Sequence, residues 1–446
     1  MSTAAGGLGL RTPSPALVRA RAAVFPESDA AVARRIGWIW GLLFLNVLPY
    51  SQKSALVPMP TSVGKVITQG ALGVALVLAL TLNRRLLVRP NLFLVLMSVL
   101  CVTSAMMSVR GYFGFGSVVR GGRLVGMVAV LWLLTPWWGR PDLLFLKYHR
   151  RALAAVLAVV VLGAIVFPGP AFAQAGGGRL GGAIWPVPPT QVAHYGAVLA
   201  GTTAVLWFAG LLKARSAAAI AVAGLLLVVL SHTRTALVAF LLAVLAAALS
   251  LFLSRRRVRK ALVATVVVGG LVALSFAPFL SSWFARGETN GNVSSLSGRT
   301  VVWSAVKEQP RTEVNTLFGY GMSNDSFDGL PIDSSWYATY LDQGLVGDVV
   351  DGAVLLLLLL LAVFSPRGPR RALAIFLVVY CFIASFTETG LGEASPYLLD
   401  LAVAMSVLMA PATVDAAAVV EEGTGIEGPG GRAALLAGLP DRTVSD

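Results

Sequence analysis

The chain has 446 residues, of which 57% are hydrophobic and only 13% are charged. A soluble globular domain carries about 25% charged residues, so this composition excludes an ordinary soluble protein and indicates one with many membrane spans. The formal net charge of +14 could suggest a nucleic-acid partner, but the basic residues fall in short clusters between apolar stretches, so we expect no nucleic-acid binding.

The chain begins with about 35 residues that contain several arginines and prolines and no apolar core. This composition resembles a cytoplasmic tail more than a cleavable signal, so we expect residues 1–35 to be cytoplasmic. The next part of the chain contains apolar stretches that are long enough to cross about 30 Å of hydrocarbon as helices. They lie near residues 36–50, 63–82, 91–109, 118–138, 152–168, 190–212, 217–232, 235–253, 261–283, 344–364, 371–387 and 395–411. The predicted fold is an all-α, polytopic helical bundle with about twelve transmembrane helices.

Lysine and arginine predict the orientation of these helices, because loops rich in them stay in the cytoplasm. One alternate set of connections holds most of them: Arg84, Arg85 and Arg89; Arg140, Lys147, Arg150 and Arg151; Lys213 and Arg215; Arg255, Arg256, Arg257, Arg259 and Lys260; Arg367, Arg370 and Arg371. We therefore expect a multi-pass protein of the cytoplasmic membrane with both termini inside. Residues 412–446 lack a long apolar run and predict a disordered cytoplasmic tail after a transmembrane domain at 36–411.

One long polar connection, residues 284–335, falls on the outer side of this topology. A bilayer core rejects unpaired polar backbone, and binding and catalytic residues concentrate on loops. We therefore expect any chemistry to lie in this large outer loop and at the adjacent ends of the spans.

Several arginines lie on the outer side, where the topology does not require them. Arg120 and Arg123 are three residues apart and share a helix face. Arg234 lies in SHTRTA, a tight turn between two spans, and Arg299 lies in SGRTVVW. A charge at the membrane boundary is costly and is usually kept for a partner charge, and a guanidinium fork matches phosphate oxygens. These residues are candidates for binding a lipid-linked pyrophosphate; the alternatives are lipid headgroups or pairing with acidic residues of the loop.

Several segments resemble the O-antigen ligase and polymerase family of bacterial polysaccharide enzymes. They are SHTRTALVAFLLAVL, SGRTVVW, the GYG at 319–321, IDSSWYATYLDQGLVG at 332–347 and, more weakly, PPTQVAHYGAVLAG at 188–201. The resemblance covers roughly residues 185–365. It implies transfer of a polyprenyl-pyrophosphate-linked glycan to an acceptor hydroxyl outside the membrane, with Arg234 and Arg299 as donor-phosphate residues.

The chain departs from the family pattern where a His-Asn pair usually precedes an aromatic residue. Here Asp333 and two serines precede Trp336. Asp333 could accept the acceptor's proton, because desolvation can raise the pKa of a carboxylate, or it could cap the following helix. His232 could orient Arg234 or replace the missing histidine. His194 could line a cavity or be a hydrogen-bonded structural histidine, and Glu388 is a further candidate base.

Two function classes follow from this sequence. The leading one is a metal-independent, cofactor-free, inverting glycosyltransferase of the ligase or polymerase type, with a glycan or lipid acceptor and membrane lipids around it. The three histidines and two cysteines lack metal-ligand spacing, so we expect no metal site. The alternative is a transporter or flippase for polysaccharide or lipid-linked sugar, which predicts broken helices, repeats and polar residues near the midplane. The predicted spans are largely apolar through their centres, which favours the enzyme.

Overall fold

The structure is a computed structural model that describes residues 29–49, 60–173, 178–252, 258–260 and 299–410. The ninth predicted apolar stretch (261–283), the first part of the outer loop (284–298) and most of both predicted tails lie outside these residues. Apart from one short hairpin, every regular element in the described ranges is a helix. The residues from Arg34 to Pro411 form one compact unit.

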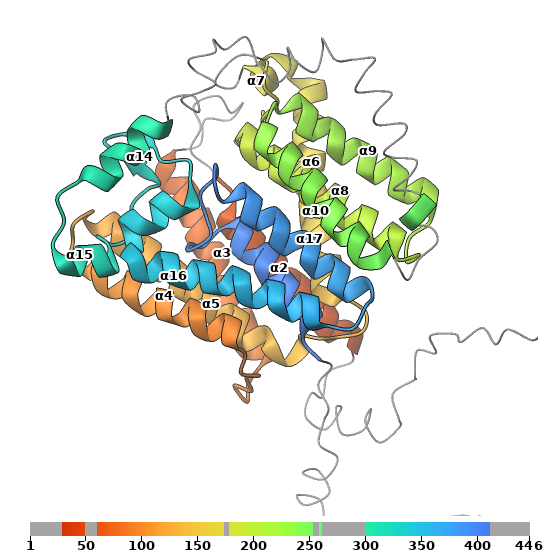
Figure 1. The fold of residues 1–446 in the computed structure, drawn as a ribbon, viewed down its shortest axis with the longest axis horizontal. Coiled ribbons are helices and arrows are strands. Elements are labelled where there is room, and N and C mark those ends of the chain that lie inside the picture. Colours follow the sequence, from red (N-terminus) through yellow and green to blue (C-terminus); the bar gives the residue numbers. More distant parts are fainter. Residues whose placement is uncertain (1–28, 50–59, 174–177, 253–257, 261–298, 411–446) are drawn as a thin grey trace, which may run out of the picture. The chain divides into compact units, whose positions relative to one another are not determined.

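Figure 1 shows how the helices of the described residues are arranged. They are α2 (Asp29–Val47), α3 (Thr61–Leu82), α4 (Leu92–Val109), α5 (Phe115–Leu134) with the 3₁₀ turn η1 (Thr135–Trp137), α6 (Leu144–Val166), α7 (Pro168–Phe172), α8 (Pro189–Phe208), α9 (Ala214–Leu230), α10 (Arg234–Phe252), α14 (Arg299–Glu308), α15 (Glu313–Phe318), α16 (Ser335–Phe364), α17 (Pro369–Ala384) and α18 (Pro396–Leu408). The hairpin pairs β1 (Ser326–Phe327) with β2 (Leu330–Pro331) in antiparallel register.

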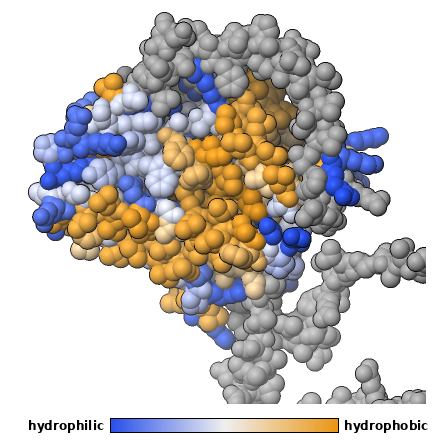
Figure 2. Space-filling model, viewed as in Figure 1, coloured by the Kyte–Doolittle hydropathy of each residue, from blue (hydrophilic) through white to orange (hydrophobic). Residues whose placement is uncertain are grey.

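Seven helices of the described residues are long and apolar enough to cross a membrane. They are α2, α3, α4, α5 with η1, α6, α10 and α16. Figure 2 shows that hydrophobic side chains form a broad, continuous surface on the viewed face. An exposed apolar surface of this extent is typical of a protein that lies in a bilayer. These findings agree with an all-α membrane protein, and the count of twelve helices stays a prediction.

Small residues allow close packing between α8 and α9. A Cβ atom on Gly196 would lie 2.8 Å from the backbone oxygen of Gly224, and one on Gly224 would lie 2.7 Å from that of Gly196. Because neither residue has a side chain, the two backbones approach directly, as is common between membrane helices. On its other side α8 packs against α10 and α17.

The described part of the predicted outer loop, residues 299–335, is a folded segment with a small core of its own. This core joins Val302 and Val306 of α14 to Tyr320, Ile332 and Leu341. The Trp303 indole N–H donates to the Ile332 carbonyl at 2.7 Å, and its ring stacks on Tyr337 with centroids 5.0 Å apart. Burial of these aromatic and branched side chains supplies the hydrophobic stabilisation that a polar loop would lack.

Helix α16 is broken at Gly344, which has φ 66° and ψ −161°. A break in an α-helix leaves carbonyl groups without their usual N–H partners. Here the Leu341 carbonyl accepts from the Tyr320 N–H at 3.0 Å, and the Asp342 carbonyl accepts from the Gly321 N–H at 2.9 Å. The GYG segment therefore completes the hydrogen bonding of the broken helix and joins residues 299–335, the described part of the predicted outer loop, to the long apolar part of α16.

Candidate active site

Arg299 and Asp333, two candidates that are distant in the sequence, form an ion pair. Arg299 is the first residue of α14, and its Nε donates to Asp333 Oδ2 at 3.1 Å. Both side chains are partly open to solvent, with 26% and 40% of their surface exposed. Ser334 occupies the N-cap position of α16, so Asp333 lies just before the helix and the alternative capping role for it is not observed.

Glu388 lies near this pair, in the connection between α17 and α18. Its half-buried position raises the pKa of its carboxyl to about 7. The positive charges of Arg299 and Arg179 and a hydrogen bond with Thr190 oppose the rise, and the negative charge of Asp333 adds to it. A carboxyl group whose pKa is near neutral is suited to general base catalysis.

The turn that contains Arg234 is tied to the same connection. Arg179 Nε donates to the Ser231 carbonyl at 3.0 Å, and its Nη2 donates to Thr233 Oγ1 at 3.3 Å. On the other side of Arg234, the Thr235 hydroxyl accepts a hydrogen bond of 2.7 Å from Thr387, the neighbour of Glu388. These contacts bring the Arg234 turn to the Glu388 connection, which itself lies within electrostatic range of Arg299.

His232 lies in the Arg234 turn and has a left-handed backbone conformation, with φ 51°. Its Nδ1 is 3.2 Å from the Leu230 carbonyl oxygen. Since a carbonyl can only accept, Nδ1 carries the proton in this bond. The structure therefore places His232 in the turn, as predicted, and its role in catalysis stays a prediction.

Arg120 and Arg123 of α5 meet another set of groups. Arg120 Nε donates to the Met322 carbonyl at 3.2 Å, and Arg123 Nη2 donates to the carbonyls of Asn46 and Ala394, each at 3.0 Å. Their charges act on Asp325, whose carboxyl is hydrogen-bonded to that of Glu393. Burial raises the pKa of both carboxyls against the pull of these arginines. The pyrophosphate-binding role predicted for Arg120 and Arg123 stays a prediction.

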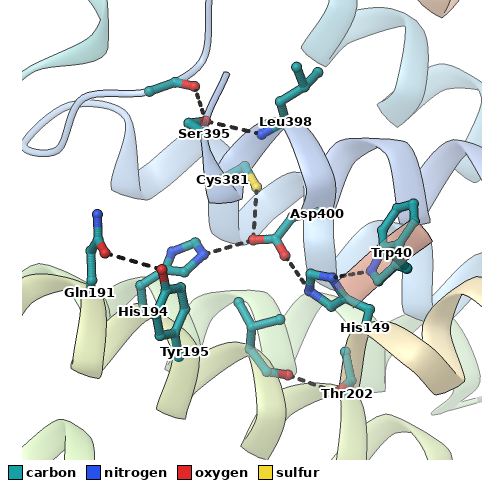
Figure 3. A network of polar contacts seen from close by, with 12 residues as sticks. Trp40, His149, Gln191, His194, Tyr195, Thr202, Cys381, Ser395, Leu398 and Asp400 are labelled. Carbon is teal, nitrogen blue, oxygen red and sulfur yellow. Dashed lines mark hydrogen bonds and ion pairs between the residues drawn. The ribbon is translucent and has the colours of Figure 1, made fainter. Parts of the chain in front are cut away.

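His194 of α8 belongs to a buried cluster inside the helical unit (Figure 3). Its Nε2 lies 3.0 Å from Asp400 Oδ2 of α18, and His149 Nε2 of α6 lies 2.8 Å from Asp400 Oδ1. The Trp40 indole N–H donates to His149 Nδ1 at 3.4 Å. This ion pair agrees with a structural role for His194, and the alternative role, lining a cavity, stays a prediction. It also places an ionisable cluster among spans that the sequence predicted to be largely apolar through their centres.

An aromatic cavity of about 670 Å³ adjoins the ion pair. It includes Ser334, the neighbour of Asp333, and Thr387, the neighbour of Glu388. Its other lining residues are Trp303, Lys307, Trp336, Tyr337, Tyr340, Leu345, Asp348 and Phe386. Most of this lining is apolar, and Phe386 at its edge is 48% exposed. We call this space the aromatic cavity.

Two features of the site escape inspection of the sequence. Only the folded chain shows that Arg179 joins the Arg234 turn to Glu388. Asp400 is an acidic residue inside an apolar stretch, which is itself a signal of a functional or paired group. In the part of the chain that the structure describes, no group of three or more His, Cys, Asp or Glu side chains is arranged to hold a metal ion.

Comparison with known proteins supports the resemblance found in the sequence. Residues 219–344 match the family described as O-antigen ligase. No curated protein matches the chain. The matched range includes Arg234, Arg299, Asp333 and the GYG segment, and it lies within the region of the predicted resemblance. Residues 219–344 of the chain are therefore similar to the O-antigen ligase family.

Proposed function

We propose that this protein is a glycosyltransferase that moves a polyprenyl-pyrophosphate-linked glycan to an acceptor hydroxyl on the outer face of the cytoplasmic membrane. The observation that carries the proposal is the gathering of the Arg299–Asp333 pair, the Arg234 turn and Glu388. Both arginines lie in the range that matches the O-antigen ligase family. The site thus combines positive charge for a phosphate leaving group with a carboxyl group for proton transfer.

Arg299 and Arg234 are the proposed donor-binding residues. A pyrophosphate carries more negative charge than a single carboxylate, so it competes effectively with Asp333 for the Arg299 guanidinium. In the absence of donor, Asp333 holds this guanidinium in place at 3.1 Å. As the bond between the anomeric carbon and the pyrophosphate oxygen breaks, the arginines neutralise the charge that develops on the leaving group. One such residue lowers the barrier by about 3 kcal/mol.

Glu388 is the proposed general base. Glu388 has a pKa of about 7 and so is substantially deprotonated at neutral pH, whereas the proposed part of Asp333 is to pair with Arg299 before the donor binds. Glu388 takes the proton of the acceptor hydroxyl while its oxygen attacks the anomeric carbon from the face opposite to the pyrophosphate. This single displacement inverts the configuration at that carbon. The arginines supply the positive charge that a metal ion provides in other transferases, so the scheme uses no metal.

The aromatic cavity is the proposed place for the first isoprene units of the carrier. Its lining is largely apolar, and it lies beside the residues that would hold the pyrophosphate. Phe386, which lines the cavity, and Phe382, whose ring packs on it, are exposed apolar side chains. A carrier lipid would then pass from the bilayer into the site without exposing its chain to water, which favours the bound state by roughly 25 cal/mol for each Å² buried.

The test is turnover of a polyprenyl-pyrophosphate oligosaccharide by the purified full chain in lipid nanodiscs. The readouts are glycan product and released polyprenyl pyrophosphate. We expect Arg234→Ala and Arg299→Ala each to lower kcat/KM by about 100-fold or more. Arg110→Ala removes an exposed arginine at the end of α4 and is the matched control, with unchanged turnover expected. Turnover that survives both site substitutions would contradict the proposal. Movement of glycan across vesicles without release of polyprenyl pyrophosphate would support the transporter alternative.

The place of the carrier chain has its own test. Phe386→Ala removes an exposed ring from the aromatic cavity, and we expect KM for the long-chain donor to rise several-fold, as for loss of one buried aromatic contact. The value of kcat should change little. Phe364→Ala, at the far end of α16, removes a ring that is also exposed and is the control. Equal KM values for the two variants would show that the carrier chain lies elsewhere.

A further inference from the structure

A second large cavity, of about 880 Å³, forms a groove along α6, α8 and α9. Its apolar lining follows α6 from Leu146 to Ile165, a distance of about 28 Å at 1.5 Å per residue. Leu162 and Ile165 in this lining are 53% and 73% exposed, so the groove is open along its side. The proposed transfer reaction uses none of these residues.

One end of the groove is basic. Lys147, Arg150 and Arg151 line it and, at spacings of three and four residues, share one face of α6. Asp142 also lines this end, but its carboxylate is already paired with Arg140 Nε at 3.1 Å. The end therefore keeps a net positive charge.

Arg150 has hydrogen-bonding capacity left for a ligand. Its Nη2 donates to Thr203 Oγ1 of α8 at 2.8 Å, which fixes the guanidinium at the edge of the groove. Its Nε is buried, and no acceptor within the described residues reaches it. A buried donor without an acceptor is costly, so a bound oxygen at this point would be favourable.

We propose that this groove binds a membrane phospholipid with an anionic headgroup. Its acyl chains lie along the apolar lining of α6 and α9, and its phosphate meets Lys147, Arg150 and Arg151. Clusters of basic residues between membrane helices attract anionic lipids, and each basic residue near the surface contributes measurably to the attraction. The proposal does not depend on the transfer reaction.

The position of the basic end distinguishes this lipid from the polyprenyl-pyrophosphate donor. Leu180, which follows α7 in the chain, donates its N–H to the carbonyl of Leu230, the last residue of α9. This bond places the α7 end of the groove next to the Arg234 turn. The basic residues lie at the beginning of α6, and α7 follows the other end of α6. A donor whose pyrophosphate lies at the Arg234 turn would place its charge away from Lys147 and Arg151. The groove therefore fits a separate lipid.

The experiment counts lipids retained by the purified full chain in native mass spectrometry, with phosphatidylglycerol or phosphatidylcholine added to the detergent solution. We expect preferential retention of phosphatidylglycerol. The double variant Lys147→Gln/Arg151→Gln changes two exposed residues and keeps the Arg150–Thr203 bond, and it should weaken this retention by roughly tenfold or more. Arg84→Gln/Arg85→Gln removes the same charge from another exposed loop and should leave retention unchanged.

A second pair of variants tests the apolar part of the groove. Ala158 lines the groove and is exposed, so Ala158→Trp should fill it and displace the lipid. Ala155 is also exposed on α6 but does not line the groove, and Ala155→Trp is the control. Equal retention of both phospholipids would overturn the anionic selectivity. Displacement by polyprenyl phosphate at equimolar concentration would assign the groove to the carrier. If the wild-type protein retained no lipid, the proposal would be overturned.

Discussion

At the residue scale, Glu388 shows how burial and neighbouring charges set the chemistry of a carboxyl group. Burial disfavours the charged form, Asp333 repels it, and Arg299 and Arg179 stabilise it. The balance leaves a pKa of about 7. If the stabilisation by the arginines were larger than the effect of burial, the pKa of Glu388 would be low. The carboxylate would then be too weak a base to take a proton from a hydroxyl. The opposing effects therefore keep Glu388 useful as a base.

The pH dependence of kcat/KM tests this assignment. A protonated Glu388 cannot accept a proton, so the rate should fall about tenfold for each pH unit below about 7 and level off above it. Glu388→Gln should lower the rate by about 100-fold or more and abolish this limb of the profile. Glu393→Gln is the matched control, because Glu393 lies in the same connection between α17 and α18 and takes no part in the proposed step. A profile that keeps its limb in Glu388→Gln would assign the base to another group.

Asp400 shows the structural use of a buried charge. It accepts hydrogen bonds from two histidines on two other helices, so α6, α8 and α18 meet at one carboxylate. Asp400→Asn removes this charge and turns one acceptor into a donor, and breaking such a buried pair costs about 3–5 kcal/mol. We expect a clear fall in the thermal unfolding midpoint.

Asp142→Asn is the matched control for Asp400→Asn. It breaks the partly exposed pair with Arg140, whose loss costs only about 0–1 kcal/mol. The readout is the difference between the two midpoints, measured in the same detergent. Equal midpoints would show that the buried cluster contributes no net stability.

Sequence patterns predicted some of these residues and missed others for a physical reason. Arg234 and Arg299 lie in recognisable motifs and at predicted membrane boundaries, where a charge needs a local explanation. Glu388 and Arg179 acquire their roles only through residues far along the chain, such as Asp333 and Thr233. A single sequence contains no measure of those distances, so it could offer Glu388 only as a candidate.

At the element scale, α16 couples the predicted outer loop to a long apolar helix. Its first part, up to the break, contributes Ala338 and Leu341 to the small outer core, and its second part is a long apolar helix. The break occurs at Gly344 because the end of α15 approaches the helix backbone there. A Cβ atom on Gly344 would lie 2.5 Å from the Leu317 carbonyl carbon.

Gly344→Ala should therefore be strongly destabilising. It forces a left-handed conformation on a residue with a side chain and pushes that side chain into backbone, a combination that costs about 4 kcal/mol or more. Gly329 in the β1–β2 turn also has a positive φ, of 79°, but a Cβ atom there would meet nothing within 4 Å. Gly329→Ala should cost only about 1–2 kcal/mol. Thermal unfolding of both variants separates the two effects, and equal losses would show that the close approach of α15 does not cause the break.

The apolar stretches indicated where helices lie, and the ends of the helices differ most from the prediction. Helix α6 begins at Leu144, before the predicted start at residue 152, because Arg150 is accommodated within it through Thr203 of α8. Helix α16 begins at Ser335, before the predicted 344, because its first turns cover the outer core. Hydropathy detects helices that contact lipid, whereas the added first turns of α6 and α16 contact other parts of the protein.

At the scale of the whole molecule, the viewed face has a broad apolar area, and the candidate site lies in the more polar part of the molecule. Figure 2 shows the hydrophilic side chains gathered over the part of the molecule that contains α14 and α15. In the predicted topology, the basic connections, such as the one with Arg84 and Arg85, lie at the opposite ends of the helices. If that topology is right, donor, acceptor and leaving group all meet outside the cytoplasm, where no nucleotide-activated sugar is present.

Cysteine labelling of intact cells tests this arrangement. Asn324→Cys places a thiol on an exposed position of the outer segment, and Arg85→Cys places one on an exposed basic connection. The native Cys101 and Cys381 are buried and should stay unreactive. A membrane-impermeant maleimide should label only the first variant in intact cells and both after the membrane is opened. Labelling of Arg85→Cys in intact cells would invert the topology, and the proposed transfer would then have to occur on the cytoplasmic face, with the arginines gripping a donor that had not yet crossed the membrane.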